Sequence, residues 1–214
     1  MIKLTFDGKA LNDPTISLME RYLIVLKSYK QMPIQLEQIL RANIHPITVR
    51  KHEMIQPVGT VSDHIYFIEK GLFRMFYPWD GKQNTFRFKK EDQFIISLKQ
   101  RMPDVIGIEA LEDSILWSFP GSLVDELRGK FHQFAIQYSV MLYKDRSYLE
   151  DAVTRPDRGA LNYYTLCKLF PDLLSRVPIP YLASYTKIPE RVFRHLHSRK
   201  IRLNFSTTRR YRRR

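Results

Sequence analysis

The sequence is poor in several features that mark particular classes of protein. Cys167 is its single cysteine, which excludes an intrachain disulfide and a multi-cysteine iron–sulfur site. No segment approaches the ~18 consecutive apolar residues that a membrane-spanning helix needs, and the first residues lack the basic start and long apolar stretch of a signal peptide. We therefore expect a cytoplasmic protein that has no membrane partner.

Catalytic and metal-binding motifs are also missing. Glycine occurs only eight times, and neither Gly-x-Ser-x-Gly nor a glycine-rich phosphate-binding loop is present. None of the six histidines forms His-Glu-x-x-His, and His195 and His197, two positions apart on a predicted helix, do not share a face. We expect neither an enzyme nor a bound metal or cofactor.

Acidic residues are absent from the last part of the chain. From Arg191 to the end there are nine arginines and one lysine but no Asp or Glu, so ten of the thirteen net positive charges lie in the last 24 residues. Such a concentrated positive field attracts polyanions through counterion release, and nucleic acid is the commonest of them. An anionic membrane fits less well, because this segment has few large apolar residues to insert. A solvated tail without any partner is the alternative.

The middle of the chain has the composition of strands. From Ile47 the sequence is rich in β-branched and aromatic residues, with turn signals at 69–71 and at Asp80-Gly81. This block ends near residues 115–120, and its short strands predict an antiparallel sandwich or barrel. We expect residues 1–121 to form the first domain.

Two other stretches have the apolar spacing of helices. Residues 15–43 predict two short helices interrupted at Pro33. Residues 122–153 predict one long helix, capped by Ser122, whose apolar residues alternate three and four apart as in a heptad seam. Such a seam packs against a second copy, although a single wide core stripe without a dimer is the alternative. The residues expected in the dimer contact are Phe134, Tyr138 and Met141.

The last domain is expected over residues 154–214, after a break in the helical pattern at 154–159. Within it, residues 177–200 predict two helices separated by a very short turn, with Ile188 as the apolar plug and Ala183 allowing close approach. The core would be supplied by Leu182, Phe193 and Leu196. The residues expected to contact DNA, on the exposed face of the second helix and in the basic tail, are Glu190, Arg191, Arg194, His195, Arg199, Lys200, Arg209, Arg210 and Arg212.

Three segments together resemble the Crp/Fnr regulators. They are VPIPYLASYTKIPERVFRHLHSRK at the predicted helix pair, LCKLFPDLLSRVP before it, and IEALEDSILWSF near the end of the strand-rich block. The resemblance covers roughly Ile47 to Lys200. It implies an α+β chain with an N-terminal cyclic-nucleotide-binding-type antiparallel jelly roll and flanking helices, a long dimerisation helix and a C-terminal winged-type helix-turn-helix domain. It also implies a dimeric regulator that binds palindromic duplex DNA.

The helix pair departs from the family pattern at three positions. Ungapped alignment places Lys187 at the usual turn glycine, where a positive φ is favoured. It places Pro189 where Thr or Ser would cap the second helix, and His195 where a base-reading Arg is usual. The family's DNA sequence preference is therefore not carried over to this chain.

The predicted sensor pocket departs further. The family's Gly-Glu pair, which meets the ribose, aligns with Ile96-Ser97, and its Arg-Ser pair, which meets the cyclic phosphate, aligns with Met102-Pro103. Arg101 is adjacent to the aligned Arg-Ser position, and it would replace the missing arginine only if the loop shifted. Without a buried Arg the phosphate charge would be desolvated without a partner. We expect an unidentified small-molecule effector, if any, and not cyclic AMP.

Two alternatives to a DNA-binding regulator remain. One is an RNA-binding protein in which the arginine-rich tail makes most of the contacts. The other is a ligand-binding or protein-binding module that has no DNA activity.

Overall fold

The computed structural model describes residues 5–6, 9–10, 23, 27, 32–60, 62–96, 106–145 and 154–199. The chain divides into two compact units, which we name the sheet unit and the helical unit. The sheet unit comprises residues 1–75 and 88–147, and the helical unit comprises residues 76–87 and 148–214. The second unit therefore contains a short segment from the middle of the strand-rich block, which the sequence does not indicate.

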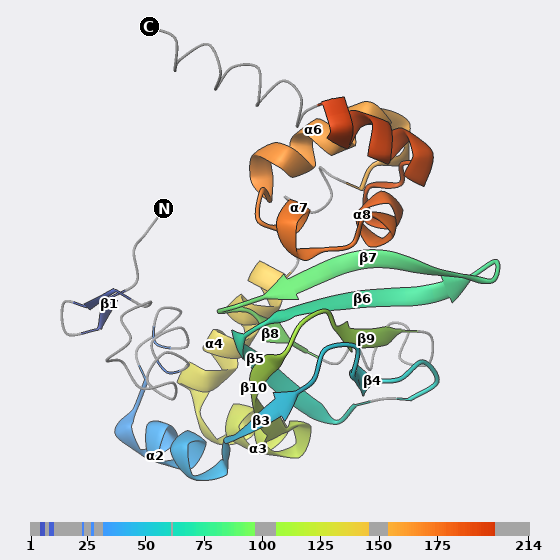
Figure 1. The fold of residues 1–214 in the computed structure, drawn as a ribbon. Coiled ribbons are helices and arrows are strands. Elements are labelled where there is room, and N and C mark those ends of the chain that lie inside the picture. Colours follow the sequence, from blue (N-terminus) through green and yellow to red (C-terminus); the bar gives the residue numbers. More distant parts are fainter. Residues whose placement is uncertain are drawn as a thin grey trace, which may run out of the picture. The chain divides into compact units, whose positions relative to one another are not determined.

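Two four-stranded sheets with antiparallel pairing account for the strand-rich block (Figure 1). One has the strand order β3-β10-β5-β8 and the other β4-β9-β6-β7, as expected for a jelly roll. The strands are β3 (His45–Val49), β4 (Met54–Gln56), β5 (His64–Lys70), β6 (Leu72–Trp79), β7 (Lys82–Lys90), β8 (Phe94–Ile95), β9 (Gly107–Ala110) and β10 (Ser114–Pro120). A separate pair near the N-terminus consists of β1 (Thr5–Phe6) and β2 (Lys9–Ala10).

Both predicted turn signals fall between strands. Gly71 alone connects β5 to β6, and the chain changes from one sheet to the other at this residue. Its φ of +119° suits glycine, and a Cβ at this position would overlap the side chain of Ser114. Asp80 and Gly81, with φ of 52° and 68°, form the two-residue turn between β6 and β7. Positive φ at both central residues is typical of tight β-hairpins.

Strand β5 explains how the sheet unit acquires its core. Its run from Ile65 to Glu69 is buried throughout, so both faces of the strand are covered. Ile65 and Phe67 point to one side and pack with Trp117 of β10 and with Leu40 of helix α2 (Ile34–Asn43). Pro33 directly precedes α2, as the predicted interruption requires. The first helix predicted within 15–43 lies outside the described residues except for positions 23 and 27.

The long helix predicted over 122–153 is two helices in the described part of the chain. Helix α3 (Gly121–Lys130) is followed by α4 (His132–Asp145), and Phe131 between them is extended with φ −124° and ψ 106°. Gly129 stands just before the break, where its low helix propensity favours an end. The prediction that Ser122 caps the helix is wrong, because α3 begins at Gly121 after Pro120 and has no side-chain cap.

A buried ion pair lies within the sheet β4-β9-β6-β7. Arg74 of β6 is 1% exposed, and its Nη2 donates to Oε2 of Glu109 in β9 at 2.5 Å. His52, in the turn before β4, contacts the other oxygen of Glu109 through Nδ1 at 2.9 Å. Removing one partner of a buried pair leaves an uncompensated charge, so the pair fixes which residues of β6 and β9 lie together.

The C-terminal segment of the helical unit forms a series of short helices. They are the 3-10 turn Pro156–Arg158, α6 (Ala160–Leu169), α7 (Leu173–Arg176), α8 (Ile179–Thr186) and a helix over residues 190–199. The hairpin formed by the ends of β6 and β7 belongs to this unit. Among the described residues, no helix has both the length and the apolar character that crossing a membrane requires.

Candidate nucleic-acid interface

Two helices of the helical unit are joined by a turn of three residues. Helix α8 ends at Thr186 and the next helix begins at residue 190. Lys187 in this turn has the left-handed conformation, with φ 57° and ψ 32°. The positive φ expected at this position is confirmed, and it costs a residue other than glycine on the order of 1 kcal/mol.

The apolar residues between the two helices are buried as predicted. Ile188 is 5% exposed, and its N–H donates to the carbonyl oxygen of Ala183 at 3.0 Å. Leu182 and Phe193 are fully buried, and Leu196 is half-buried. The turn is thus anchored from inside by Ile188, and the angle of the second helix depends on this small core.

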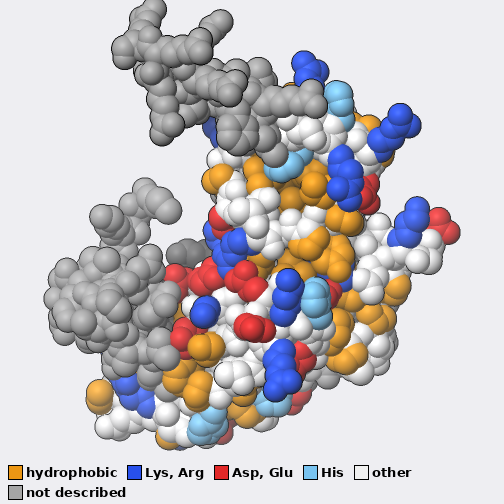
Figure 2. Space-filling model, viewed as in Figure 1, with side chains coloured by type: hydrophobic (Ala, Val, Ile, Leu, Met, Phe, Trp, Pro, Cys, Tyr) orange, Lys and Arg blue, Asp and Glu red, His pale blue; other side chains and the backbone are white. Residues whose placement is uncertain are grey.

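The opposite side of the second helix is exposed and basic. Its exposed residues include Glu190, Arg191, Arg194, His195 and Arg199. Nε and Nη2 of Arg194 both donate to Oε1 of Glu190, at 2.8 and 2.5 Å, so the single acidic side chain of the helix is paired. Figure 2 shows basic and histidine side chains on the surface of this unit. The other predicted contact residues, Lys200, Arg209, Arg210 and Arg212, lie outside the described residues.

The two histidines of this helix lie in different surroundings. His195 is exposed, whereas the ring of His197 stacks on Phe193 and its Nδ1 lies 3.3 Å from the hydroxyl of Tyr163. Within the part of the chain that the structure describes, no group of three His, Cys, Asp or Glu side chains is placed to hold a metal ion.

Asn162 is a buried positioning residue that the sequence analysis missed. This residue of α6 is 1% exposed, and its Nδ2 donates to the carbonyl oxygens of Arg155 at 2.7 Å and Thr186 at 2.8 Å. It therefore ties α6 to the last residue of α8, directly before the left-handed turn. An asparagine within the mainly apolar helical run 160–170 is the signal that could have identified it.

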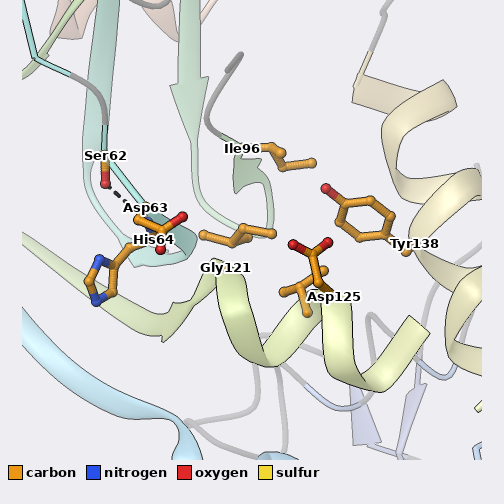
Figure 3. Close-up of a pocket in the computed structure, with 9 residues that line it drawn as sticks. Ser62, Asp63, His64, Ile96, Gly121, Asp125 and Tyr138 are labelled. Carbon is orange, nitrogen blue, oxygen red and sulfur yellow. Dashed lines mark hydrogen bonds between the residues drawn. The ribbon is translucent and has the colours of Figure 1, made fainter. Parts of the chain in front are cut away.

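A small pocket lies in the sheet unit, at the start of β5 and beside α3 and α4 (Figure 3). Its volume is about 90 Å³, and Asp63, Asp125, Tyr138 and Ile96 are among its lining residues. Neither Lys nor Arg occurs among the described residues that line it. Nη1 of Arg128 lies 3.4 Å from Oδ1 of Asp125, so that carboxylate is paired outside the lining. The lining itself presents two carboxylates and no Lys or Arg side chain, which disfavours a phosphate-bearing ligand at this place.

Solved structures share the fold of this chain at low sequence identity. FixK2 from Bradyrhizobium japonicum is 14% identical, with a TM-score of 0.59, and the match covers 75% of this chain and 86% of FixK2. A cyclic nucleotide-binding domain from Methylobacillus flagellatus is 12% identical, with a TM-score of 0.51, over 72% of this chain and 83% of that domain. This chain has their fold.

The structural neighbours are Crp/Fnr-type regulators and cyclic nucleotide-binding domains. No protein-family model and no curated protein sequence matches the chain. At these identities the likeness concerns the fold, so the function has to be argued from the residues of this chain.

The residues predicted for the sensor pocket are only partly described. Ile96, aligned with the glycine of the nucleotide-binding cassette, is 6% exposed and belongs to the core of the sheet unit. Ser97, Arg101 and Met102 lie outside the described residues. The described part of the cassette is thus apolar, and its role in ligand binding stays a prediction.

The residues predicted for the dimer contact have different surroundings. Phe134 is 3% exposed and packs in the core of its own chain, and Tyr138 is half-buried against that core. The side chain of Met141 lies outside the described part of the structure. Leu142 and Tyr143, further along α4, are 39% and 62% exposed. Phe134 is therefore buried in the core of its own chain and is not exposed to a second copy. The exposed apolar residues lie nearer the end of α4.

Proposed function

We propose that the chain is a Crp/Fnr-like transcription regulator that binds palindromic duplex DNA as a dimer and catalyses no reaction. The observation that carries this proposal is the helix pair formed by α8 and residues 190–199. We call the second of these the recognition helix. Its apolar side is held by Ile188 and Phe193, while Arg191 and His195 lie exposed on the other side. The fold shared with FixK2 supports a regulator of this architecture.

The chemistry of the recognition helix suits the major groove of DNA. Arginine makes two parallel hydrogen bonds to guanine, and histidine donates one over a shorter reach. Glu190 holds the guanidinium of Arg194 along the helix in the absence of DNA. This exposed pair contributes little to stability, so Arg194 can exchange the carboxylate for a base edge or a phosphate at small cost. The arginine-rich tail would contact phosphates without a fixed register.

The sheet unit would act as the sensor in a cytoplasmic regulator. Its apolar cassette residue Ile96 and the acidic lining of the described pocket favour an effector without a phosphate group. We therefore propose a small-molecule effector other than cyclic AMP.

Selection of bound fragments from random duplex DNA tests the proposal. A recovered palindrome supports both the dimer and the sequence-specific contact. Arg191→Ala and Arg194→Ala should each reduce discrimination between the selected duplex and a scrambled one by about 1–3 kcal/mol per lost base contact. Val192→Ala is the matched control, because Val192 is 44% exposed on the same helix and carries no hydrogen-bonding group.

A gel shift with structured RNA distinguishes the main alternative. If the chain bound RNA and duplex DNA of any sequence equally well, and if Arg191→Ala and Arg194→Ala changed neither, the helix pair would not be a DNA reader. The arginine-rich, RNA-binding function would then replace the proposed one.

A further inference from the structure

The hairpin at the ends of β6 and β7 groups with the helical unit, although the rest of both strands belongs to the sheet unit. Thr85 of this hairpin is fully buried, and its backbone N–H donates to Oγ of Ser184 in α8 at 2.9 Å. A buried N–H without an acceptor costs free energy comparable to a lost hydrogen bond. The hydroxyl of Ser184 therefore fixes the hairpin at a specific place on α8.

A second contact reaches the turn itself. Nζ of Lys187 lies 5.9 Å from the centre of the Tyr77 ring, within the range of a cation–π interaction. Tyr77 is in turn placed by Phe86 on the other strand of the hairpin, with ring centroids 6.1 Å apart. Burial lowers the pKa of Lys187, and the negative face of the ring compensates the partly desolvated ammonium.

Both contacts lie close to the start of the recognition helix. Ser184 is in the last turn of α8, and Lys187 is the left-handed residue three positions before Glu190. Asn162 holds the intervening Thr186 from α6. The backbone that sets the direction of the recognition helix is thus restrained by the hairpin and by α6 at adjacent residues.

Resting on the proposed function, we propose that the hairpin over residues 76–87 is a working part of the DNA-reading unit. Tyr77 and Ser184 are positioning residues in this assignment. They touch no DNA, and they act by holding the turn at Lys187 so that Arg191 and Arg194 present their guanidinium groups at one fixed angle. A misplacement of a preorganised contact weakens specific binding more than non-specific binding, because phosphate contacts tolerate small rotations.

The test compares disruptive with conservative variants of the full chain. Ser184→Ala and Tyr77→Leu remove the acceptor and the ring, whereas Ser184→Thr and Tyr77→Phe retain them. Trp79→Ala is the control, since Trp79 lies in the same hairpin and is 72% exposed. The readouts are the affinity ratio between selected and scrambled duplexes, the thermal midpoint, and amide hydrogen exchange of the peptide that contains Thr85.

We expect Ser184→Ala and Tyr77→Leu to lower the affinity ratio by at least about fivefold, comparable to losing one base contact, with non-specific affinity unchanged. Exchange at the Thr85 peptide should accelerate in both variants. Ser184→Thr, Tyr77→Phe and Trp79→Ala should behave as the wild type.

Two results would overturn the inference. Unchanged exchange in Ser184→Ala and Tyr77→Leu would show that the hairpin does not hold α8, whatever the chain binds. Faster exchange with an unchanged affinity ratio would show that the contact exists but does not position the recognition helix. Failure of the proposed function is distinct from both, because the wild type itself would then show no preference between the two duplexes.

Discussion

Lys187 combines a backbone conformation that most side chains avoid with a favourable contact of its ammonium group. Lys187→Gly should relieve about 1 kcal/mol of left-handed strain, but it also removes a cation–π contact worth about 0.5–1 kcal/mol. We expect little net change in the wild type and a stabilisation of about 1 kcal/mol in a Tyr77→Leu background. Urea denaturation of the four chains measures the difference. Equal effects of Lys187→Gly in both backgrounds would contradict the contact.

Gly71 and Gly81 have positive φ for different structural reasons. A Cβ at Gly71 would overlap Ser114, whereas a Cβ at Gly81 has no atom within 4 Å. Gly71→Ala should therefore cost roughly 2–4 kcal/mol from strain and overpacking, and Gly81→Ala about 1 kcal/mol from strain alone. Thermal unfolding of the two variants gives the comparison. Similar midpoints would indicate that the strand connection at Gly71 relaxes.

Tyr163 makes the stability of the helical unit fall with increasing pH in the alkaline range. Burial, followed by the neighbouring Cys167, raises the pKa of this phenol in the folded chain. An unfolded tyrosine ionises near pH 10, so the stabilisation is complete below about pH 10 and is lost as the pH rises above it. Tyr163→Phe should flatten the dependence of the unfolding free energy on pH in this range, while Tyr164→Phe, at a 57% exposed neighbour, is the control. Equal slopes for wild type and Tyr163→Phe would contradict the prediction.

Helix α4 offers different residues to its own core and to the surface. Phe134→Ala should destabilise the fold by about 3–5 kcal/mol, because Phe134 packs between the sheet unit's helices and strands. Leu142→Glu should leave the thermal midpoint almost unchanged and shift a dimer towards monomer. Sedimentation velocity combined with thermal unfolding separates the two effects. A Leu142→Glu chain that remains dimeric would place the dimer contact elsewhere.

At the level of helices and strands, the sequence predicted features that depend on neighbouring residues better than it predicted which elements pack together. Turn chemistry identified Asp80-Gly81, and apolar spacing identified Ile188 as the plug, because both depend on residues close in sequence. Spacing could not show that Phe134 faces its own core, since a core stripe and a dimer seam have the same period. The break at Phe131 and the role of Asn162 depend on tertiary contacts that periodicity does not report.

At the scale of the whole molecule, the proposed sensor function can be tested with cyclic AMP. Calorimetry at millimolar cyclic AMP should detect weak binding or none, because Ile96 is a core residue and neither Lys nor Arg is among the described residues that line the pocket. Arg101→Ala is the matched variant, because Arg101 is adjacent in sequence to the position of the missing cassette arginine. A low-micromolar dissociation constant that disappears in Arg101→Ala would show that this arginine has taken over the phosphate contact.

The sharing of β6 and β7 between the two units limits how the chain can be divided. Each strand begins in one unit and ends in the other, so no single cut separates them. A fragment that starts at residue 148 would lose the hairpin and leave the Ser184 hydroxyl without the Thr85 amide. A chimaera that exchanges only the C-terminal segment would therefore need a matching hairpin as well. Without one, the residues of that segment that the hairpin covers would have to be replaced by hydrophilic ones. Recombination within residues 154–159 is for this reason a poor route to new combinations of the sheet unit and the helical unit.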